Sequence, residues 1–188
     1  MKEHKALDSM IEQGFKNLRE GQFEEAVETF SACHAIEPRD DRALRGRGLA
    51  YIQLKNALSA ETDFKLAKTL NSDEPENQMG FALTLAMQNK IYEAIGIYEE
   101  LIHQNPGYIL AYLQLGHLQL KIGTISKGRE YFKKALTLRP TLEQRRLIES
   151  ILKEQSKLDA NRFYRPDFEQ LRKQQPSTFN LWKFIRGL

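Results

Sequence analysis

Small and aromatic residues recur along this chain with a period of 34 residues. Four segments, beginning at Leu7, Asp41, Pro75 and Ile109, align without a gap. Their eighth positions hold Gly14, Gly48, Ala82 and Gly116, and their twentieth hold Ala26, Ala60, Ala94 and Gly128. The twenty-fourth positions hold Phe30, Phe64, Tyr98 and Phe132. A fixed period of this length is typical of repeat proteins, in which similar units bury a continuous core by stacking on one another.

The pattern within each segment predicts two antiparallel helices. Apolar residues follow helical spacing, as at Ala94, Ile97, Tyr98 and Leu101. Small side chains at the eighth and twentieth positions would let the two helices approach closely, and the aromatic ring would fill the space before the next pair. The residues Gly21, Asn56, Asn89 and Gly123, which tolerate left-handed backbone, are expected between the helices of each pair. The sequence therefore predicts an all-α solenoid with four repeats, at 7–40, 41–74, 75–108 and 109–142.

A further helix is predicted after the fourth repeat, over residues 143–160. Thr141 and Gln144 form a capping-box pattern at its start. Its apolar face would consist of Leu147, Ile148, Ile151 and Leu152. A stacked array needs a terminal helix that is apolar inside and polar outside, so this segment is interpreted as the C-terminal capping helix. Residues 1–6 remain as an N-terminal extension and 161–188 as a basic, apolar-rich tail with short helices.

Over residues 7–142 the sequence resembles the tetratricopeptide repeat family, on the small and aromatic positions given above. The resemblance implies a right-handed helical solenoid whose first helices line a concave groove, through positions 2, 5, 9, 12 and 13 of each repeat. The seventh position departs from the family pattern, because Gln13 and Arg47 replace the usual leucine. Some family members clamp the C-terminal carboxylate of heat-shock chaperones with lysine at position 5 and asparagine at position 9. Here these positions hold Ile11 and Phe15, which disfavours that ligand.

The resemblance assigns a peptide-binding groove to this chain. The groove would comprise Ile11, Phe15, Leu18, Arg19, Arg42, Arg45, Leu49, Ile52, Gln53, Met79, Leu83, Met87, Leu113, His117, Leu120 and Lys121, with Glu76 and Leu110 at the second position. Exposed apolar area of this extent normally marks a binding site, although Phe15, Leu49 and Leu83 could be partly covered by neighbouring helices. Arg19, Arg42 and Arg45 could bind a carboxylate of a ligand, or could pair within the chain with Asp8, Glu12, Asp40 or Asp41.

Charge and composition exclude several kinds of partner. The formal net charge is +3, and residues 161–188, with six basic and two acidic side chains, account for all of it. The repeats therefore carry no basic excess, and no nucleic acid is predicted as a partner. No apolar run approaches the ~20 residues of a membrane-spanning helix, so no integral membrane segment is expected. A single cysteine, Cys33, cannot form an intrachain disulfide, which favours a cytoplasmic location.

The tail is a second candidate site. Five large apolar residues, Phe179, Leu181, Trp182, Phe184 and Ile185, fall within seven positions and are predicted to dock against a partner. Three fates remain open for them. The tail could fold back onto its own array, or dock into another copy or another protein, which would allow a homo-oligomer. It could also lie on an anionic membrane surface, because basic residues accompany the aromatic ones.

No residues suited to catalysis, cofactor binding or metal binding stand out. The four histidines lack metal-ligand spacing, and no glycine-rich phosphate loop is present. Cys33 occupies a packing position, so it is interpreted as a buried thiol rather than a nucleophile. The chain is therefore predicted to be a protein–protein interaction module or adaptor rather than an enzyme, with a chaperone that shields an apolar client segment as its more specific form. The alternatives are a scaffold that self-associates through the tail and a peripheral membrane-associated adaptor.

Overall fold

The computed structural model describes residues 2–160, and within this range the chain forms nine α-helices and no strand. The helices are α1 (Lys2–Glu20), α2 (Phe23–Ile36), α3 (Asp41–Gln53), α4 (Ala57–Leu70), α5 (Pro75–Met87), α6 (Ile91–Gln104), α7 (Ile109–Lys121), α8 (Ile125–Thr137) and α9 (Leu142–Ala160). The helices α2, α4, α6 and α8 each begin 34 residues after the one before. The predicted all-α solenoid is confirmed. The predicted N-terminal extension is not separate, because Lys2–Ala6 belong to α1.

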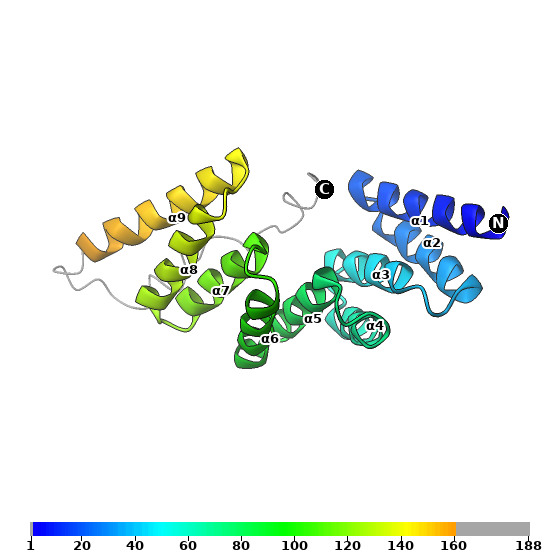
Figure 1. The fold of residues 1–188 in the computed structure, drawn as a ribbon, viewed down its shortest axis with the longest axis horizontal. Helices are drawn as coiled ribbons and strands as arrows, with labels where there is room; N and C mark the ends of the chain where they lie inside the picture. The colour runs from blue at the N-terminus through cyan, green and yellow to red at the C-terminus, as the bar shows by residue number, and fades with distance from the viewer. Residues whose placement is uncertain (1, 161–188) are drawn as a thin grey trace.

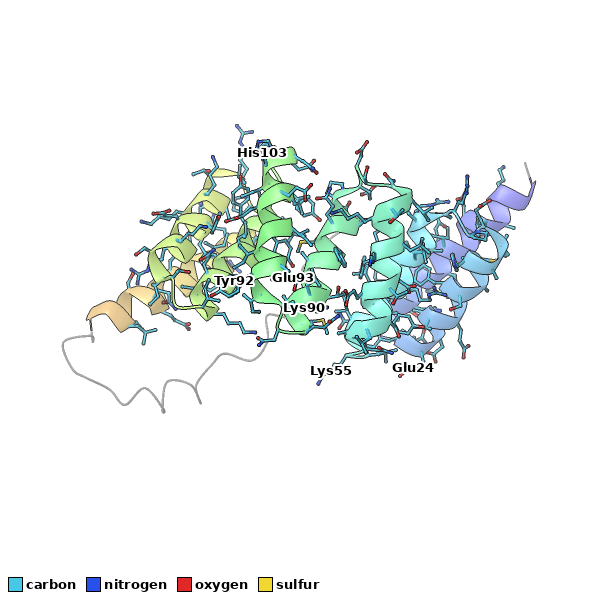
Figure 2. All side chains as sticks on the ribbon, turned by 90° about the horizontal axis from the view of Figure 1, so that it is seen from below. Glu24, Lys55, Lys90, Tyr92, Glu93 and His103 are labelled. Carbon is cyan, nitrogen blue, oxygen red and sulfur yellow. The ribbon has the colours of Figure 1, made fainter. Side chains whose placement is uncertain are left out.

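The helix pairs stack side by side into a curved array (Figure 1). The helices α1 and α9 lie at its two ends, and α4 and α6 lie on its outer side. Figure 2 views this outer side, where Tyr92 and Glu93 project from α6 and His103 lies near the opposite end of the same helix. Tyr92 is 77% exposed, so α6 turns this ring away from the core. The tail residues 161–188 lie outside the part of the chain that the structure describes.

In each of the first two repeats the aromatic residue lies in a slot formed by two glycines. A Cβ on Gly14 or on Gly46 would lie within 2.7 Å of the Phe30 ring, so both helices approach that ring closely. Gly14 belongs to the first helix of the same repeat and Gly46 to the first helix of the next. The Phe64 ring lies in the same way between Gly48 and Gly80. The predicted role of the aromatic position in joining successive pairs is therefore confirmed.

At the seventh position, polar contacts replace the leucine that is usual in the family. The Arg47 guanidinium donates to both Asp63 carboxylate oxygens, at 2.8 Å each, and to Ser31 Oγ at 3.1 Å. Arg47 therefore links α3 to α4 of its own repeat and to α2 of the first repeat. In the first repeat, Gln13 donates to Asn17 Oδ1 at 2.7 Å. The two departures from the family pattern are thus accommodated by two separate sets of polar contacts and do not disturb the architecture.

Left-handed backbone occurs at the same place in all four helical hairpins. The residues are Gly21, Lys55, Asn89 and Gly123, with φ between 59° and 86°. The prediction that Asn56 would adopt this conformation is wrong. Asn56 instead caps α4, because its side chain accepts a hydrogen bond from the Ser59 N–H at 3.2 Å. The left-handed position therefore falls on Lys55, a residue type that rarely adopts it.

Replacing Lys55 with glycine should stabilise the protein by about 1 kcal/mol, because left-handed backbone costs an L-residue about 1–2 kcal/mol and glycine almost nothing. The exposed Lys55 side chain contributes little that would be lost. Urea unfolding of the two proteins would measure the difference, and Gly21→Lys is the reciprocal control, expected to be destabilising. An unchanged or lower midpoint for Lys55→Gly would show that the turn is not strained.

The capping helix begins as predicted. The Thr141 N–H donates to Gln144 Oε1 at 2.9 Å, and the Gln144 N–H donates to Thr141 Oγ1 at 3.3 Å, which are the two hydrogen bonds of a capping box. Ile148 of α9 is fully buried with Leu113 and Phe132, and Ile151 packs against the same cluster. The end of the array is thereby covered by α9.

Candidate peptide-binding groove

A hollow of about 660 Å³ lies along α1, α3, α5 and the start of α7. It is lined by Glu12, Phe15, Leu18, Arg19, Arg45, Leu49, Glu74, Glu76, Met79, Gly80, Leu83, Tyr108 and Leu110. The first helices supply almost all of these residues, because the second helices α4 and α6 lie on the outer side of the array (Figure 1). The hollow, called the groove below, therefore crosses three repeats and reaches the fourth.

The surface of the groove is largely apolar. Leu18 and Met79 are buried and form its floor. Phe15, Leu49 and Leu83 are only partly buried, so their side chains cover neighbouring helices and also face the groove. The Phe15 ring packs edge-on against the Phe30 ring, with 5.1 Å between ring centroids. This contact fixes Phe15 against the core and leaves its other face available to a ligand.

Carboxylates collect at the end of the groove formed by α3, α5 and α7. Arg45 Nη1 lies 3.4 Å from Glu74 Oε1 and 4.0 Å from Asp41 Oδ2. The pKa of Glu74 is raised by its hydrogen bond with Glu76, by burial and by the charge of Glu76. Burial and the charges of Glu76 and Glu74 also raise the pKa of Tyr108. Because Arg45 is already shared between two carboxylates, Glu76 leaves this end of the groove with an excess of negative charge.

The structure brings together nine of the residues predicted for the groove: Phe15, Leu18, Arg19, Arg45, Leu49, Glu76, Met79, Leu83 and Leu110. It does not place the other nine there: Ile11, Arg42, Ile52, Gln53, Met87, Leu113, His117, Leu120 and Lys121. Ile11 is buried in the core of the first helix pair. Arg42 Nη2 pairs with Asp40 at 2.6 Å and with Asp8 at 2.9 Å, and the hydrogen bond with Asp40 raises the pKa of Arg42. For Arg42 the intramolecular alternative is therefore the correct one.

The fourth repeat differs from the others because the capping helix packs against it. Leu113 is fully buried and clusters with Ile148 of α9, and Leu120 is partly buried against the same cluster. The array ends here, and a cluster that joins α7, α8 and α9 takes up apolar residues of α7 that the family pattern assigns to the groove. Among the residues of this repeat, Leu110 alone lines the groove, beside Tyr108, which is the last residue of the third repeat.

Four residues that line the groove were not predicted: Glu12, Glu74, Gly80 and Tyr108. Glu12 and Gly80 occupy the sixth position of their repeats, and Glu74 and Tyr108 the last position before the next helix. Helical spacing could have identified Gly80, because Glu76, Met79, Gly80 and Leu83 are related by steps of three or four residues. The sixth position of the family pattern therefore also faces the groove in this chain.

His117, which was predicted in the groove, instead packs inside the fourth repeat. Its ring meets the Phe132 ring edge-on, with 5.2 Å between centroids. Burial lowers the pKa of His117 from 6.5 to about 4. The folded protein therefore holds this ring neutral at a pH at which the unfolded chain would protonate it.

Acid should destabilise the protein through His117. Between pH 6.5 and 4 the unfolded chain binds the proton and the folded one does not, so the free energy of unfolding falls as the pH is lowered through this range. The shift corresponds to a loss of at most about 3 kcal/mol. The variant His117→Leu introduces the leucine that the second and third repeats have at this position. Its free energy of unfolding should fall less as the pH is lowered. Urea unfolding midpoints of both proteins at about pH 7, 5.5 and 4.5 would measure this difference. If the midpoints of the two proteins fell equally with pH, His117 would be excluded as the cause.

The described residues contain no cluster of potential metal ligands. Burial raises the pKa of the Cys33 thiol, and Cys33 is fully buried in the first repeat, as its packing position predicts. Between residues 2 and 160, no helix combines the length and the apolar character needed to cross a bilayer.

Comparison with known proteins identifies the architecture. A family model described as tetratricopeptide repeat matches residues 109–142, which correspond to the fourth 34-residue unit. Residues 109–142 are therefore a tetratricopeptide repeat, and the three preceding helix pairs follow the same 34-residue period. Over 158 residues it is 26% identical to human tetratricopeptide repeat protein 6, in a match that covers 78% of this chain and 29% of the relative. The chain spans less than a third of the length of the curated relatives it matches.

Solved structures of other tetratricopeptide repeat proteins share the fold. A thermophilic protein from Thermus thermophilus superimposes with a TM-score of 0.72 at 18% identity, over 78% of this chain and 81% of that one. The first tetratricopeptide repeat domain of Spaghetti (RPAP3), solved with a bound HSP90 peptide, gives a TM-score of 0.59 at 23% identity, over 62% of this chain and 94% of that one. At these identities the similarity establishes the fold alone.

Proposed function

We propose that this tetratricopeptide repeat protein is a protein–protein interaction module whose groove binds an extended or helical segment of a partner. The observation that carries this proposal is the groove itself, an apolar hollow of about 660 Å³ to which Phe15, Leu49 and Leu83 contribute. This volume lies within the range of about 300–1,000 Å³ that is usual for ligand sites. A chaperone that shields an apolar segment of a client would use the same groove.

The charges around the groove indicate the chemistry of its ligand. The groove combines an apolar floor with three acidic side chains, Glu12, Glu74 and Glu76, and two basic ones, Arg19 and Arg45. A segment with large apolar side chains flanked by lysine or arginine fits this arrangement. The Spaghetti domain was solved with an HSP90 peptide. The acidic end of the groove, with Ile11 and Phe15 at the positions that clamp the chaperone carboxylate, disfavours such a ligand here.

Peptide display on the full chain would test the proposal. We expect selected peptides to contain apolar side chains next to basic ones, and to lose at least tenfold in affinity when Leu49→Glu or Leu83→Glu places a charge in the groove. Tenfold corresponds to about 1.4 kcal/mol, less than the cost of burying an unpaired charge. The matched control is Leu58→Glu, because Leu58 on α4 is 72% exposed and does not line the groove.

Circular dichroism would establish that the variants remain helical. Peptides that bind the wild type and both groove variants equally would place the binding site elsewhere and contradict the proposal. The scaffold and membrane-adaptor alternatives both depend on the tail, which lies outside the described residues, and they remain predictions.

A further inference from the structure

We infer that residues 177–188 of this chain occupy its own groove as an intramolecular ligand, which a partner segment must displace. This inference rests on the proposed function and adds a regulatory occupant to the same site. The groove is one half of the argument, and the amino-acid sequence of the segment is the other.

The apolar residues of the segment match the apolar surface of the groove. Phe179, Trp182 and Ile185 follow one another at intervals of three residues, so a helical segment would present them on one side. Fully burying such side chains contributes about 1.5–3 kcal/mol each. The groove offers Phe15, Leu49, Leu83 and Leu110 as the opposing surface.

The charges are complementary as well. The segment contains Lys183 and Arg186 and no acidic side chain. The groove has an excess of negative charge at Glu76, which lies close enough to Glu74 to raise the pKa of that carboxyl through a hydrogen bond, together with burial and the charge of Glu76. A lysine or arginine placed beside this pair would neutralise the repulsion. Residues 177–188 are therefore a basic and apolar segment of the kind that the groove is suited to bind.

The chain between the array and the segment is long enough to reach the groove. The capping helix α9 has 19 residues and is about 28 Å long. Residues 161–176 can span up to about 55 Å when extended. The connection can therefore run back along α9 to Ile148, whose cluster also packs against Leu110 of the groove. No other chain is needed to bring the segment to the groove.

Tethering favours the intramolecular arrangement over a second copy. A flexible connection of this length gives an effective concentration on the order of millimolar, well above micromolar protein in solution. A partner peptide must compete with this concentration, so its apparent affinity is its intrinsic affinity multiplied by the fraction of grooves that are unoccupied. The segment would thus reject weak ligands and admit those that bind the groove strongly.

Trp182 provides a direct test, because it is the only tryptophan in the chain. In the full-length protein we expect its fluorescence to be blue-shifted and protected from acrylamide quenching. Leu49→Glu and Leu83→Glu should shift the emission to longer wavelength and remove the protection, whereas Leu58→Glu should change neither. Phe179→Ser, which leaves the array untouched, should have the same effect as the groove variants.

Three outcomes would overturn the inference. In the folded wild-type protein, Trp182 could be as accessible to acrylamide as it is in the protein unfolded by urea. It could be protected but insensitive to both groove variants, which would place the segment on another surface. Its protection could also depend on protein concentration and accompany a doubled mass by light scattering, which would assign the segment to the groove of a second copy.

Peptides from the display experiment separate this inference from the proposed function. If the segment competes for the groove, Trp182→Ser should bind these peptides several-fold more tightly than the wild type. Equal binding by both proteins would overturn the inference while the groove remained a peptide-binding site. Protection of Trp182 by the groove without any peptide binding would instead support the segment as an occupant and count against a partner.

Discussion

Replacing Asp63 with alanine should destabilise the protein by about 3 kcal/mol, the largest effect that we expect from a single change outside the groove. The Asp63 carboxylate is buried and accepts two hydrogen bonds from Arg47, at 2.8 Å each. Removing one partner of a buried ion pair leaves the other charge uncompensated, which typically costs about 3–5 kcal/mol. The lower end applies here, because the Arg47 side chain keeps 18% of its surface in contact with solvent. Urea unfolding would measure the change.

The third repeat provides a matched control for this ion pair. At the positions of Arg47 and Asp63 it has Phe81 and Ile97, which pack against the core of that repeat. The double variant Arg47→Phe/Asp63→Ile should therefore lie within about 1 kcal/mol of the wild type, since replacing a buried pair with apolar side chains is often neutral. Arg47→Phe alone should destabilise the protein about as much as Asp63→Ala. A double variant that is no more stable than the single variants would show that the second repeat cannot accommodate the apolar pair of the third.

The sequence predicted the fold well because the same few contacts form in every repeat. In every repeat the eighth position is glycine or alanine and the twenty-fourth is an aromatic residue, and all four aromatic rings are fully buried. The 34-residue period therefore reflects packing geometry directly, and it located the helices without knowledge of other side chains. The capping box at Thr141 was predictable for a similar reason, because it depends only on residues three positions apart.

The groove was predicted less completely, because its limits depend on contacts between distant parts of the chain. No local pattern shows that α9 covers Leu113, which has the same position in its repeat as Met79. Arg42 pairs with Asp8 of another helix, whereas the sequence left this pairing and ligand binding as two alternatives. Left-handed backbone at Lys55 was missed because Asn56, one residue later, is the more usual residue for that conformation.

The acidic end of the groove connects the fold to its proposed function. Glu74 and Tyr108 stand at the last position of their repeats, immediately before a first helix begins. The turns between repeats therefore contribute polar groups to a surface whose floor comes from the helices. Under the proposed function, this division would let the turns select the charge of a ligand while the helices bind its apolar side chains. A family pattern based on helix positions alone does not include the turn residues of the groove.

Gly80→Ala should destabilise the protein by about 2 kcal/mol, although alanine is the better helix former. Gly80 lies within α5, where alanine would gain about 0.8–1 kcal/mol from helix propensity. Its Cβ, however, would lie 2.0 Å from Cε1 of Phe64, a fully buried ring that cannot move without displacing the core. Overpacking of this kind costs about 1–3 kcal/mol and sometimes more. We expect the steric cost to exceed the gain in propensity.

Gly96→Ala is the matched control for this prediction, because Gly96 also lies within a helix but has no atom within 4 Å of the new Cβ. It should stabilise the protein by about 1 kcal/mol, so the two glycine-to-alanine changes should move the unfolding midpoint in opposite directions. Adding Phe64→Leu to Gly80→Ala should recover part of the loss, since a smaller side chain would leave room for the methyl group. Stabilisation by Gly80→Ala alone would show that the Phe64 ring is not held between Gly48 and Gly80, and the packing of the second repeat against the third would need another explanation.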